Sequence, residues 1–341
     1  MKAKLIEYFK TIDDRSKKEL IDTLQKMVDE SDYELLITNE KQLNEKQGKC
    51  PHCGSLKYVR NGKKNGVQNY KCKSCNRGFT AYTGTWLAHI HKKEKLVPYL
   101  KMMQQGSSLN KIKEQLEISK KTAFDWRHKI CASLDKQEMN KLSGITESDE
   151  TFFLHSEKGE RKLDREARKR GKEVKKRGIS KDHVAVITTT DRKKTMCLQV
   201  TCFGRISQSD IEATIGNMVN STTVLCSDGH RSYQSFAKEK KLEHHIVTAS
   251  KNERVKEGKY HIQNINSMHS RMKKWINFSL YGVATKNLQN YMNWFYIKEK
   301  FKQKEFIYKV ISHSAANISG RKNYLTMHEY YQTMVEKSLL N

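Results

Sequence analysis

The chain has 341 residues, and its 65 lysines and arginines outnumber 38 aspartates and glutamates, which gives a formal net charge of +27 at pH 7. That length allows two or three domains, each with a core of its own. So large a positive excess indicates a polyanionic partner. Nucleic acid fits it better than a membrane, because no apolar run approaches the roughly 18–20 residues that span a bilayer.

Residues 1–47 are charged and carry apolar positions at helical spacing, which predicts two short helices. These helices would either pack against the next module or help the chain to dimerise, and packing is the simpler interpretation. The first residues, MKAKLIEYFKTIDDR, lack the apolar core of a signal peptide. We therefore expect the protein to stay in the reducing compartment where it is made.

Residues 48–90 contain two CxxC motifs separated by eighteen residues. Each motif is expected to form a tight turn that points two thiolates at one spot, and two such turns make a tetrahedral four-sulfur site suited to one structural zinc ion. A reducing compartment disfavours disulfides, and the pairing of the motifs disfavours a redox role. Strands are predicted at residues 57–60 and 68–71, around a turn at 65–66. The predicted ligands of this zinc ribbon are Cys50, Cys53, Cys72 and Cys75, and the four remaining cysteines are expected in cores.

Residues 91–143 are predicted to form a helix-turn-helix DNA-binding domain. A helix at 95–105 precedes a second one that carries Ile112 and Leu116, and a third follows at 120–134 with Ser119 as its N-cap. Any small helical bundle gives a similar pattern, but the neighbouring ribbon and the basic charge favour DNA binding. The third helix supplies the candidate DNA contacts, each of which is alternatively a solvated charge: Lys120, Lys121, Arg127 and Lys129.

Residues 144–300 alternate short apolar runs with helical patterns, which predicts an α/β domain with a mixed sheet. Strands are predicted at 145–154, 183–190, 196–202, 222–227 and 245–249, and helices at 211–219, 233–241 and about 262–276. A basic insertion at 157–181 is most simply a solvated loop, with a contact to the DNA backbone as the second interpretation. Residues 301–341 are predicted to be a helical tail.

Two aspartates stand on predicted strands of this domain. Asp149 lies within the first strand, and Asp228 ends the fourth, where Gly229 lets the chain turn sharply. Metal-dependent phosphodiester chemistry needs several oxygen ligands at one spot, because Mg²⁺ is hard and octahedral. A pair of such ions can stabilise both the attacking and the leaving oxygen. An acid followed by glycine is also common in surface loops, so neither aspartate identifies a site alone.

The segment YHIQNINSMHSRMKKWI resembles the last catalytic helix of the insertion-sequence transposases of the DDE superfamily. The closest resemblance is to the ISXO2-like group, which begins with the same kind of zinc ribbon, and it runs from about residue 50 to 295, including YGVATKNLQNYMNWF. Many members carry a glutamate and, seven residues later, a lysine, whereas a subgroup has asparagine in place of the glutamate. Here the pair is Asn266 and Lys273, which share one helix face because seven residues make close to two turns.

The resemblance implies a multidomain α+β protein whose catalytic domain is RNase H-like. It implies that Asp149 and Asp228 bridge the metals, that Asn266 is the third ligand, and that Lys273 contacts phosphate at the transposon end. Glu147, on the same strand face as Asp149, is a candidate to supply the charge that Asn266 lacks. His261 matches a family histidine and is a candidate phosphate contact, with a polar helix-terminus residue as the alternative.

The sequence thus predicts a DNA transposase that binds the terminal inverted repeats of an insertion sequence and catalyses strand cleavage and strand transfer. The implied catalytic cofactor is Mg²⁺ or Mn²⁺, as two ions. The implied partners are double-stranded DNA and further copies of the chain, in the prokaryotic cytoplasm at the nucleoid. One alternative is a regulator that only binds DNA, because asparagine at position 266 weakens the metal site. Another is a ribonuclease or repair nuclease with the same fold.

Overall fold

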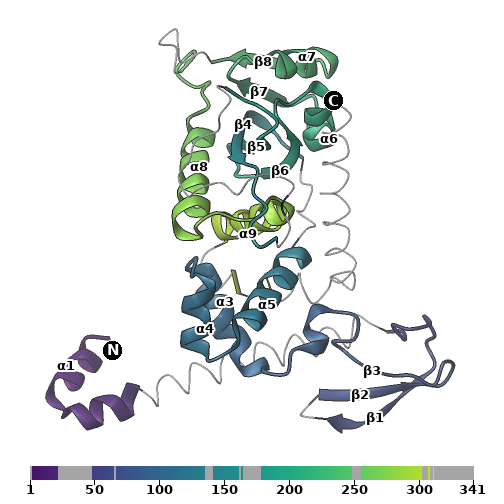
Figure 1. The fold of residues 1–341 in the computed structure, drawn as a ribbon, viewed down its shortest axis with the longest axis vertical. Coiled ribbons are helices and arrows are strands. Elements are labelled where there is room, and N and C mark those ends of the chain that lie inside the picture. Colours follow the sequence, from purple (N-terminus) through teal and green to yellow (C-terminus); the bar gives the residue numbers. More distant parts are fainter. Residues whose placement is uncertain are drawn as a thin grey trace.

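The computed structural model describes residues 2–21, 48–64, 67–134, 141–160, 163, 178–247, 255–301, 306–307 and 310. Figure 1 shows helix α1 (Lys2–Thr11), a three-stranded ribbon, a group of three helices and a five-stranded sheet flanked by helices. A second helical stretch begins at Asp14 and is described to Ile21. The predictions for residues 22–47, for most of the basic insertion and for most of the C-terminal tail lie outside the described residues.

The ribbon consists of β1 (Tyr58–Lys64), β2 (Val67–Cys72) and β3 (Gly78–Thr80), antiparallel in the order β1-β2-β3. Two strands were predicted here and are confirmed, whereas the third was not predicted. The predicted turn at 65–66 lies outside the described residues. The rings of Tyr58, Tyr70 and Phe79 pack against one another with centroids 5.3–5.5 Å apart. With only this aromatic cluster and two buried cysteines, Cys50 and Cys72, the ribbon has a very small core.

The next segment is helical, as predicted. Two short 3-10 turns, η1 (Trp86–His89) and η2 (Lys93–Lys95), lead into α3 (Leu96–Gln104), α4 (Leu109–Leu116) and α5 (Lys120–Ser133). Helix α4 ends at Glu117, whose φ of 49° is left-handed, and the Ser119 side chain accepts a hydrogen bond from the Thr122 N–H at the start of α5. The predicted N-cap is confirmed, and α4 and α5 form a helix-turn-helix.

The larger sheet has the strand order β6-β5-β4-β7-β8. Its strands are β4 (Gly144–Leu154), β5 (His183–Asp191), β6 (Met196–Phe203), β7 (Thr223–Ser227) and β8 (Glu243–Ile246). The first three are antiparallel neighbours, whereas β7 runs parallel to β4 and β8 parallel to β7. This mixed sheet is RNase H-like, as the sequence implied, and it places β4 and β7 side by side in the centre.

Helices cover both faces of that sheet (Figure 1). Helices α6 (Gln208–Ile215) and α7 (Arg231–Glu239) share a core with Ala185 and Ile187 of β5. On the opposite face, α8 (Gln263–Lys274) and α9 (Leu288–Lys300) pack with Val184 and Val186. The alternation of these β5 side chains follows from the period of two along a strand. No helix among the described residues is long and apolar enough to cross a membrane.

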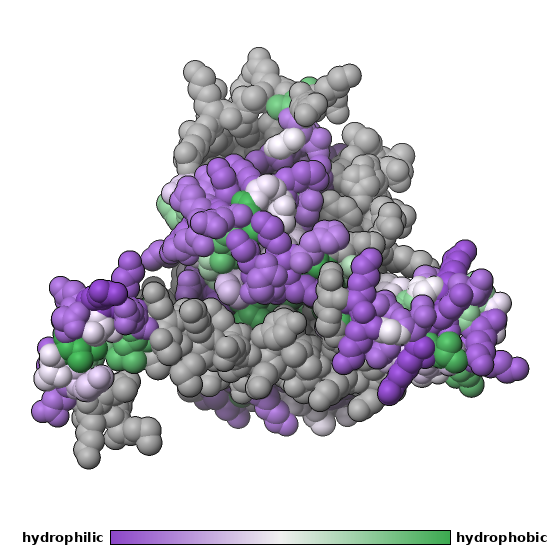
Figure 2. All heavy atoms as spheres, turned by 90° about the horizontal axis from the view of Figure 1, so that it is seen from below, coloured by the Kyte–Doolittle hydropathy of each residue, from purple (hydrophilic) through white to green (hydrophobic). Residues whose placement is uncertain are grey.

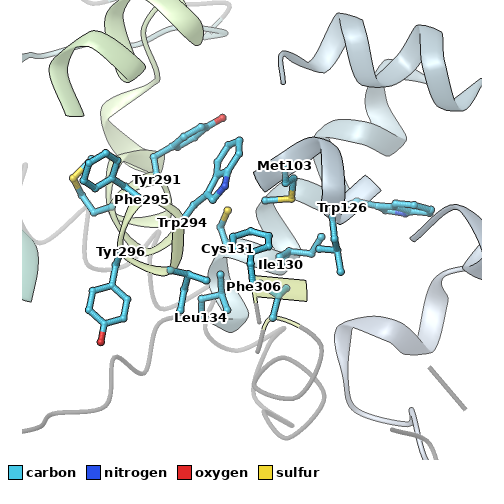
Figure 3. Packing of buried hydrophobic residues seen from close by; sticks show 14 of the residues in the cluster. Met103, Trp126, Ile130, Cys131, Leu134, Tyr291, Trp294, Phe295, Tyr296 and Phe306 are labelled. Carbon is cyan, nitrogen blue, oxygen red and sulfur yellow. The ribbon is translucent and has the colours of Figure 1, made fainter. Parts of the chain in front are cut away.

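One apolar cluster continues from the helix-turn-helix into the catalytic domain. Figure 3 shows Ile130 and Cys131 of α5 facing Trp294 of α9, while Trp126, in the same buried cluster, points to the other side of α5. Buried apolar surface contributes about 25 cal/mol per Å², so a shared core of this kind holds the two modules together. The predicted division at residue 143 stays a prediction: one core crosses it, and the domain of the larger sheet has a second core of its own.

Arg127, predicted as a DNA contact, lies inside this junction. Its side chain is 2 % exposed, its guanidinium is 4.8 Å from the Trp294 ring, and Nη2 donates to the Ser107 carbonyl at 2.7 Å. The prediction for this residue is therefore corrected, because the α5 face that bears Arg127 packs on α9. A basic residue on a helix cannot be assigned to the DNA side until the packed face is known.

The described surface is mostly hydrophilic. Seen from below, apolar patches occur at the two outlying parts of the molecule, left and right (Figure 2). They correspond to the N-terminal helical region, where Ile21 is exposed, and to the ribbon, where Leu56 and Val59 are exposed.

Candidate active site

The two predicted aspartates lie on neighbouring parallel strands. The β4–β7 register pairs Glu147 with Cys226, and two residues further along both strands come Asp149 and Asp228. Asp228 follows the last residue of β7 and is exposed, whereas the Asp149 side chain is 15 % exposed. The topology therefore brings to one edge of the sheet two carboxylates that stand 79 positions apart in the sequence.

A glycine fixes the turn that presents Asp228. Gly229 has a φ of +88°, and an added Cβ would stand 2.6 Å from Cγ2 of Ile246 on the neighbouring strand β8. The left-handed conformation and the close approach both exclude a larger residue. The turn is also held by the His230 N–H, which donates to Oδ1 of Asp228 at 2.9 Å. The sharp turn predicted at this glycine is confirmed.

Helix α8 carries three polar residues on one face, and one of them contacts Asp149. Asn266, His269 and Lys273 stand at spacings of three and four residues and so share one face of the helix. His269 Nδ1 lies 3.8 Å from Oδ2 of Asp149, and the positive charge of Lys273 acts on both of these groups. Asn266 is exposed one turn before His269. The structure thus places His269 against Asp149.

The electrostatics of this edge favour a bound cation. Burial raises the pKa of Asp149 to about 8, with further contributions from the charges of Glu150 and Asp228 and an opposing one from Lys273. Burial and the Asp228 charge raise the pKa of Glu150 to about 7, and burial lowers that of His269 to about 4. Clustered acids that resist ionisation are characteristic of functional sites. Carboxylate oxygens at one edge of the sheet are also hard donors of the kind that Mg²⁺ prefers.

Both carboxylate oxygens of Glu147 are engaged by partners other than the aspartate pair. Its side chain is 1 % exposed, and Oε2 accepts hydrogen bonds from the backbone N–H groups of Asn264 at 2.9 Å and Ile265 at 3.2 Å. Oε1 lies 2.6 Å from the Asn264 amide nitrogen and 2.6 Å from Nη1 of Arg192. The suggestion that Glu147 compensates for Asn266 is therefore corrected. It caps the N-terminus of α8, two residues before Asn266.

His261 belongs to the same network. Its Nε2 is 3.2 Å from Nη2 of Arg192, and its Nδ1 is 3.4 Å from Oε1 of Glu147. Arg192 also donates to the Lys259 carbonyl at 3.1 Å. This arrangement ties the entry of α8 to β4 and to the end of β5. A phosphate contact by the half-buried His261 stays a prediction.

We predict that Glu147→Gln lowers the free energy of unfolding of the catalytic domain by about 3–5 kcal/mol, the cost of removing one partner from a buried ion pair. Glutamine keeps the volume but loses the charge that pairs with Arg192 and caps α8. Urea unfolding followed by tryptophan fluorescence measures the change. Glu150→Gln is the matched control, because its pKa of about 7 leaves it partly protonated near neutral pH. Equal losses in both variants would contradict the capping role.

The four ribbon cysteines converge as predicted. Their sulfur atoms all lie within 4.8 Å of one another, with Cys50 and Cys75 at 3.7 Å and Cys53 and Cys72 at 3.6 Å. All four are free thiols, which excludes the disulfide alternative in this structure. Zinc–sulfur bonds of about 2.3 Å in a tetrahedron place sulfurs about 3.8 Å apart. Backbone N–H groups, chiefly that of Cys75, lower the pKa of the Cys72 thiol to about 6. The cluster could therefore hold a metal ion.

The remaining predicted DNA contacts lie on α5. Lys120 and Lys121 at its N-terminus are exposed, and Lys129 is half-buried. Lys121 is 3.1 Å from Asp125 one turn later in an exposed ion pair, which contributes little to stability. These three side chains are accessible in a way that Arg127 is not, and their contact with DNA stays a prediction.

The protein belongs to the mixed α+β class. It combines an RNase H-like core that carries two aspartates with a preceding helix-turn-helix and a four-cysteine ribbon. Within the chain, residues 141–299 match the family model of the ISXO2-like transposase domain. These residues are similar to that transposase domain, which confirms for them the resemblance seen in the sequence.

Two further proteins are similar to the chain. One is an uncharacterized protein in transposable element ISH50 of Halobacterium salinarum, 24 % identical over 254 residues, which cover 74 % of this chain and 85 % of that protein. The other is found in the crystal structure of a pre-cleavage Mos1 transpososome. It is 10 % identical with a TM-score of 0.29, and the match covers 69 % of this chain and 77 % of that one.

Proposed function

We propose that the protein is a DNA transposase that cleaves and joins strands at the terminal inverted repeats of its own element. The observation that carries this proposal is the position of Asp149 on β4 and of Asp228 directly after the neighbouring parallel strand β7, with His269 of α8 3.8 Å from Asp149. The transposase family of residues 141–299 supports the same reaction class. Transposition by this route also requires DNA binding, for which the basic surface and the helix-turn-helix are suited.

In the proposed reaction, Asp149, Asp228 and the amide oxygen of Asn266 would hold Mg²⁺ or Mn²⁺, which supplies Lewis-acid activation of water and of a DNA 3′-hydroxyl. Lys273 shares the α8 face with Asn266 and would bind the phosphate next to the scissile bond. His269 stays neutral near pH 7 because its pKa is about 4, so it can orient Asp149 without adding charge. Glu147 and Arg192 hold α8 so that Asn266 keeps its place.

The N-terminal modules would recognise the ends of the element. The four cysteines of the ribbon would hold one structural zinc ion, and α5 would present Lys120, Lys121 and Lys129 to DNA. Because α5 shares a core with α9, DNA bound by the helix-turn-helix would be held in a fixed relation to the active site. Paired ends would be brought together by a homodimer or a higher assembly in the prokaryotic cytoplasm.

The test is cleavage of a labelled duplex that carries the terminal repeats, with Mg²⁺, with Mn²⁺ or with no added divalent ion. We expect nicks at the repeat ends in the first two reactions and none in the third. Tight binding without cleavage under every condition would instead support the DNA-binding regulator. A preference for RNA or for damaged duplex over the repeat ends would favour a nuclease of another function.

Metal binding at the aspartates is expected to depend on pH. Asp149, with a pKa of about 8 in the metal-free protein, is mostly protonated at pH 7, so a metal must displace its proton. The apparent affinity for Mn²⁺ should rise about tenfold per pH unit from pH 6 towards pH 8 and then level off. Titration calorimetry measures this slope, and Asp149→Asn should remove it. An affinity that is the same at pH 6 and pH 8 would contradict the assignment of Asp149.

A further inference from the structure

The turn between α3 and α4 contacts the end of helix α8, although α8 belongs to the candidate active site and the turn to the helix-turn-helix module. Gly106 in this turn has a φ of +76°, and an added Cβ there would stand 3.1 Å from Nε1 and 3.5 Å from Cδ1 of Trp275. Trp275 is buried and begins the π-helical turn η4 (Trp275–Ser279), which continues α8. The backbone of one module therefore packs directly on the indole that ends the helix of the other, and a side chain at position 106 would press against it.

Hydrogen bonds hold the α3–α4 turn in one conformation. The N–H groups of Gly106 and Ser107 donate to the carbonyl oxygens of Met103 at 2.8 Å and Met102 at 2.9 Å, which is the Schellman arrangement that ends a helix. From α5, Nη2 of Arg127 donates to the carbonyl oxygen of Ser107 at 2.7 Å. The turn is thus fixed by its own backbone and by a buried guanidinium.

Arg127 also connects the turn to the aromatic residues that surround the end of α8. Its guanidinium stands 4.8 Å from the ring of Trp294, and that ring meets the Trp275 ring edge to face, with centroids 4.8 Å apart. Within the described part of the chain, Nε of Arg127 and Nε1 of both tryptophans have no hydrogen-bond partner, which costs stability. An apolar side chain of similar volume would close the junction without burying a charge, so the guanidinium indicates a role other than stability.

Helix α8 is anchored at its two ends by different modules. At the N-terminal end the catalytic domain holds it through Glu147. At the C-terminal end Trp275 contacts both the α3–α4 turn and α9. Lys273 stands two residues before Trp275, about 3 Å along the helix axis, and close packing transmits a shift of one group to its neighbours. A displacement of Trp275 therefore moves the α8 face that carries Asn266 and Lys273.

We propose that Gly106 and Arg127 are positioning residues of the reaction: they set where the end of α8 lies and so fix the active-site face of α8 relative to the helix-turn-helix. They act through α8 rather than on the aspartates or on the reacting phosphate. DNA held by the helix-turn-helix would then be cut at one phosphate, because this contact sets the distance from the recognition surface to the aspartates. This inference rests on the proposed function, because it assumes that the aspartates cut the DNA that the helix-turn-helix binds.

The experiment compares full-length variants for their affinity for the labelled terminal-repeat duplex and for its cleavage with Mg²⁺. Arg127→Met keeps a long apolar side chain and removes the guanidinium, and Gly106→Ala places a methyl group against the indole that ends α8. Arg127→Lys retains a charge and a donor. Two controls match these changes. Lys238→Met removes an exposed charge from α7, and Gly144→Ala introduces alanine at another left-handed φ, +62°, where the described residues leave space for the added Cβ.

We expect Arg127→Met and Gly106→Ala to bind the duplex as tightly as the wild type does. At saturating protein they should cut about tenfold more slowly or less, and at several neighbouring phosphates, since a misplacement of about 1 Å can cost about 10²-fold in rate. Arg127→Lys should recover part of the rate, and both controls should cut as the wild type does. Loss of affinity in both variants, or a wild-type rate and cut position in both, would overturn the inference.

Hydrogen exchange followed by mass spectrometry tests the same contact without cleavage. In both variants the amides of residues 271–276, at the end of α8, should exchange about tenfold faster than in the wild type, while those of α4 and α5 keep their protection. Unchanged exchange at the end of α8 would overturn the inference. Faster exchange throughout α4 and α5 would do the same, because the two residues would then serve folding alone. Wild-type protein that binds the duplex but never cuts it would overturn the proposed function, and the exchange rates would still decide whether the turn holds α8.

Discussion

Asp149→Asn is expected to lower the rate of strand cleavage about a thousandfold or more, with DNA binding retained. The substitution keeps the size of the side chain and its hydrogen bond from the Glu150 N–H, but it removes one of the two aspartate charges that face α8. Loss of a single electrostatic contact to the reacting groups costs about 10²–10³ in rate, and loss of a metal ligand also weakens occupancy of the site. Single-turnover cleavage of the terminal-repeat duplex at saturating protein measures the effect.

Glu150→Gln is the matched control, because it changes the next residue of the same strand to its neutral amide. Glu150 projects to the opposite face of the sheet from Asp149. We therefore expect cleavage within about tenfold of the wild type, the size of effect that a neighbouring, non-ligating group produces. If the two variants lost activity equally, the aspartate pair would not be the centre of the reaction. If Asp149→Asn also lost DNA binding, its effect on cleavage would have to be assigned to substrate affinity.

Much of this fold could be predicted from the sequence, because its signals are local. Short apolar runs mark the strands of the larger sheet, and the paired CxxC motifs mark the ribbon, since each of these patterns is read within a few residues. Boundaries were less well predicted. Helix α6 begins at Gln208 rather than near 211, because Ser207 and Asp210 form a capping box that extends the helix by a turn. Strand β8 lies at Glu243–Ile246, earlier than predicted, since its partner β7 sets its register.

The candidate site was only partly predictable, for a physical reason. Asp149 and Asp228 could be proposed because each lies on a strand whose hydrophobic pattern is clear. The roles of Glu147 and Arg127 depend instead on which face another helix covers, and that information is not local. Glu147 meets the N-terminus of α8 across 117 residues of chain, and Arg127 is buried by α9. A buried charge in each case is compensated by partners that only the tertiary structure reveals.

We expect position 266 to tolerate asparagine even though Glu147 supplies no charge to the site. With Glu147 engaged in capping α8, the negative charge at the site comes from Asp149 and Asp228 in the described part of the chain, with Glu150 acting from the other face of the sheet. Burial raises the pKa of Asp149 to about 8, and the charges of Glu150 and Asp228 add to that effect. A third carboxylate at position 266 would add to that effect until metal is bound.

Removal of the ribbon metal is expected to unfold residues 48–80 while the catalytic domain stays folded. The ribbon core consists of three aromatic rings and the cysteines themselves, which is too little apolar surface to offset the ordering of the chain. In small zinc modules the metal supplies about 10–16 kcal/mol, so chelation should remove most of the folding free energy. Chelation by phenanthroline, followed by amide NMR spectra and zinc analysis, measures both changes. We expect one zinc per chain before treatment.

Two cysteine variants make this prediction specific. Cys72→Ser removes a buried ligand whose pKa is already lowered to about 6, and it should lower the zinc content to near zero and unfold the ribbon. Cys202→Ser, a half-buried cysteine of β6 outside the cluster, should retain the zinc. Loss of the ribbon should leave the aspartates in place, because they lie in a domain that has a core of its own. A DNA-cleavage assay therefore distinguishes loss of DNA recognition from loss of the reaction itself. If the ribbon serves recognition, Cys72→Ser should lose affinity for the terminal repeats but should still cut at high protein concentration. A folded ribbon that contains no metal would show that aromatic packing alone sustains it.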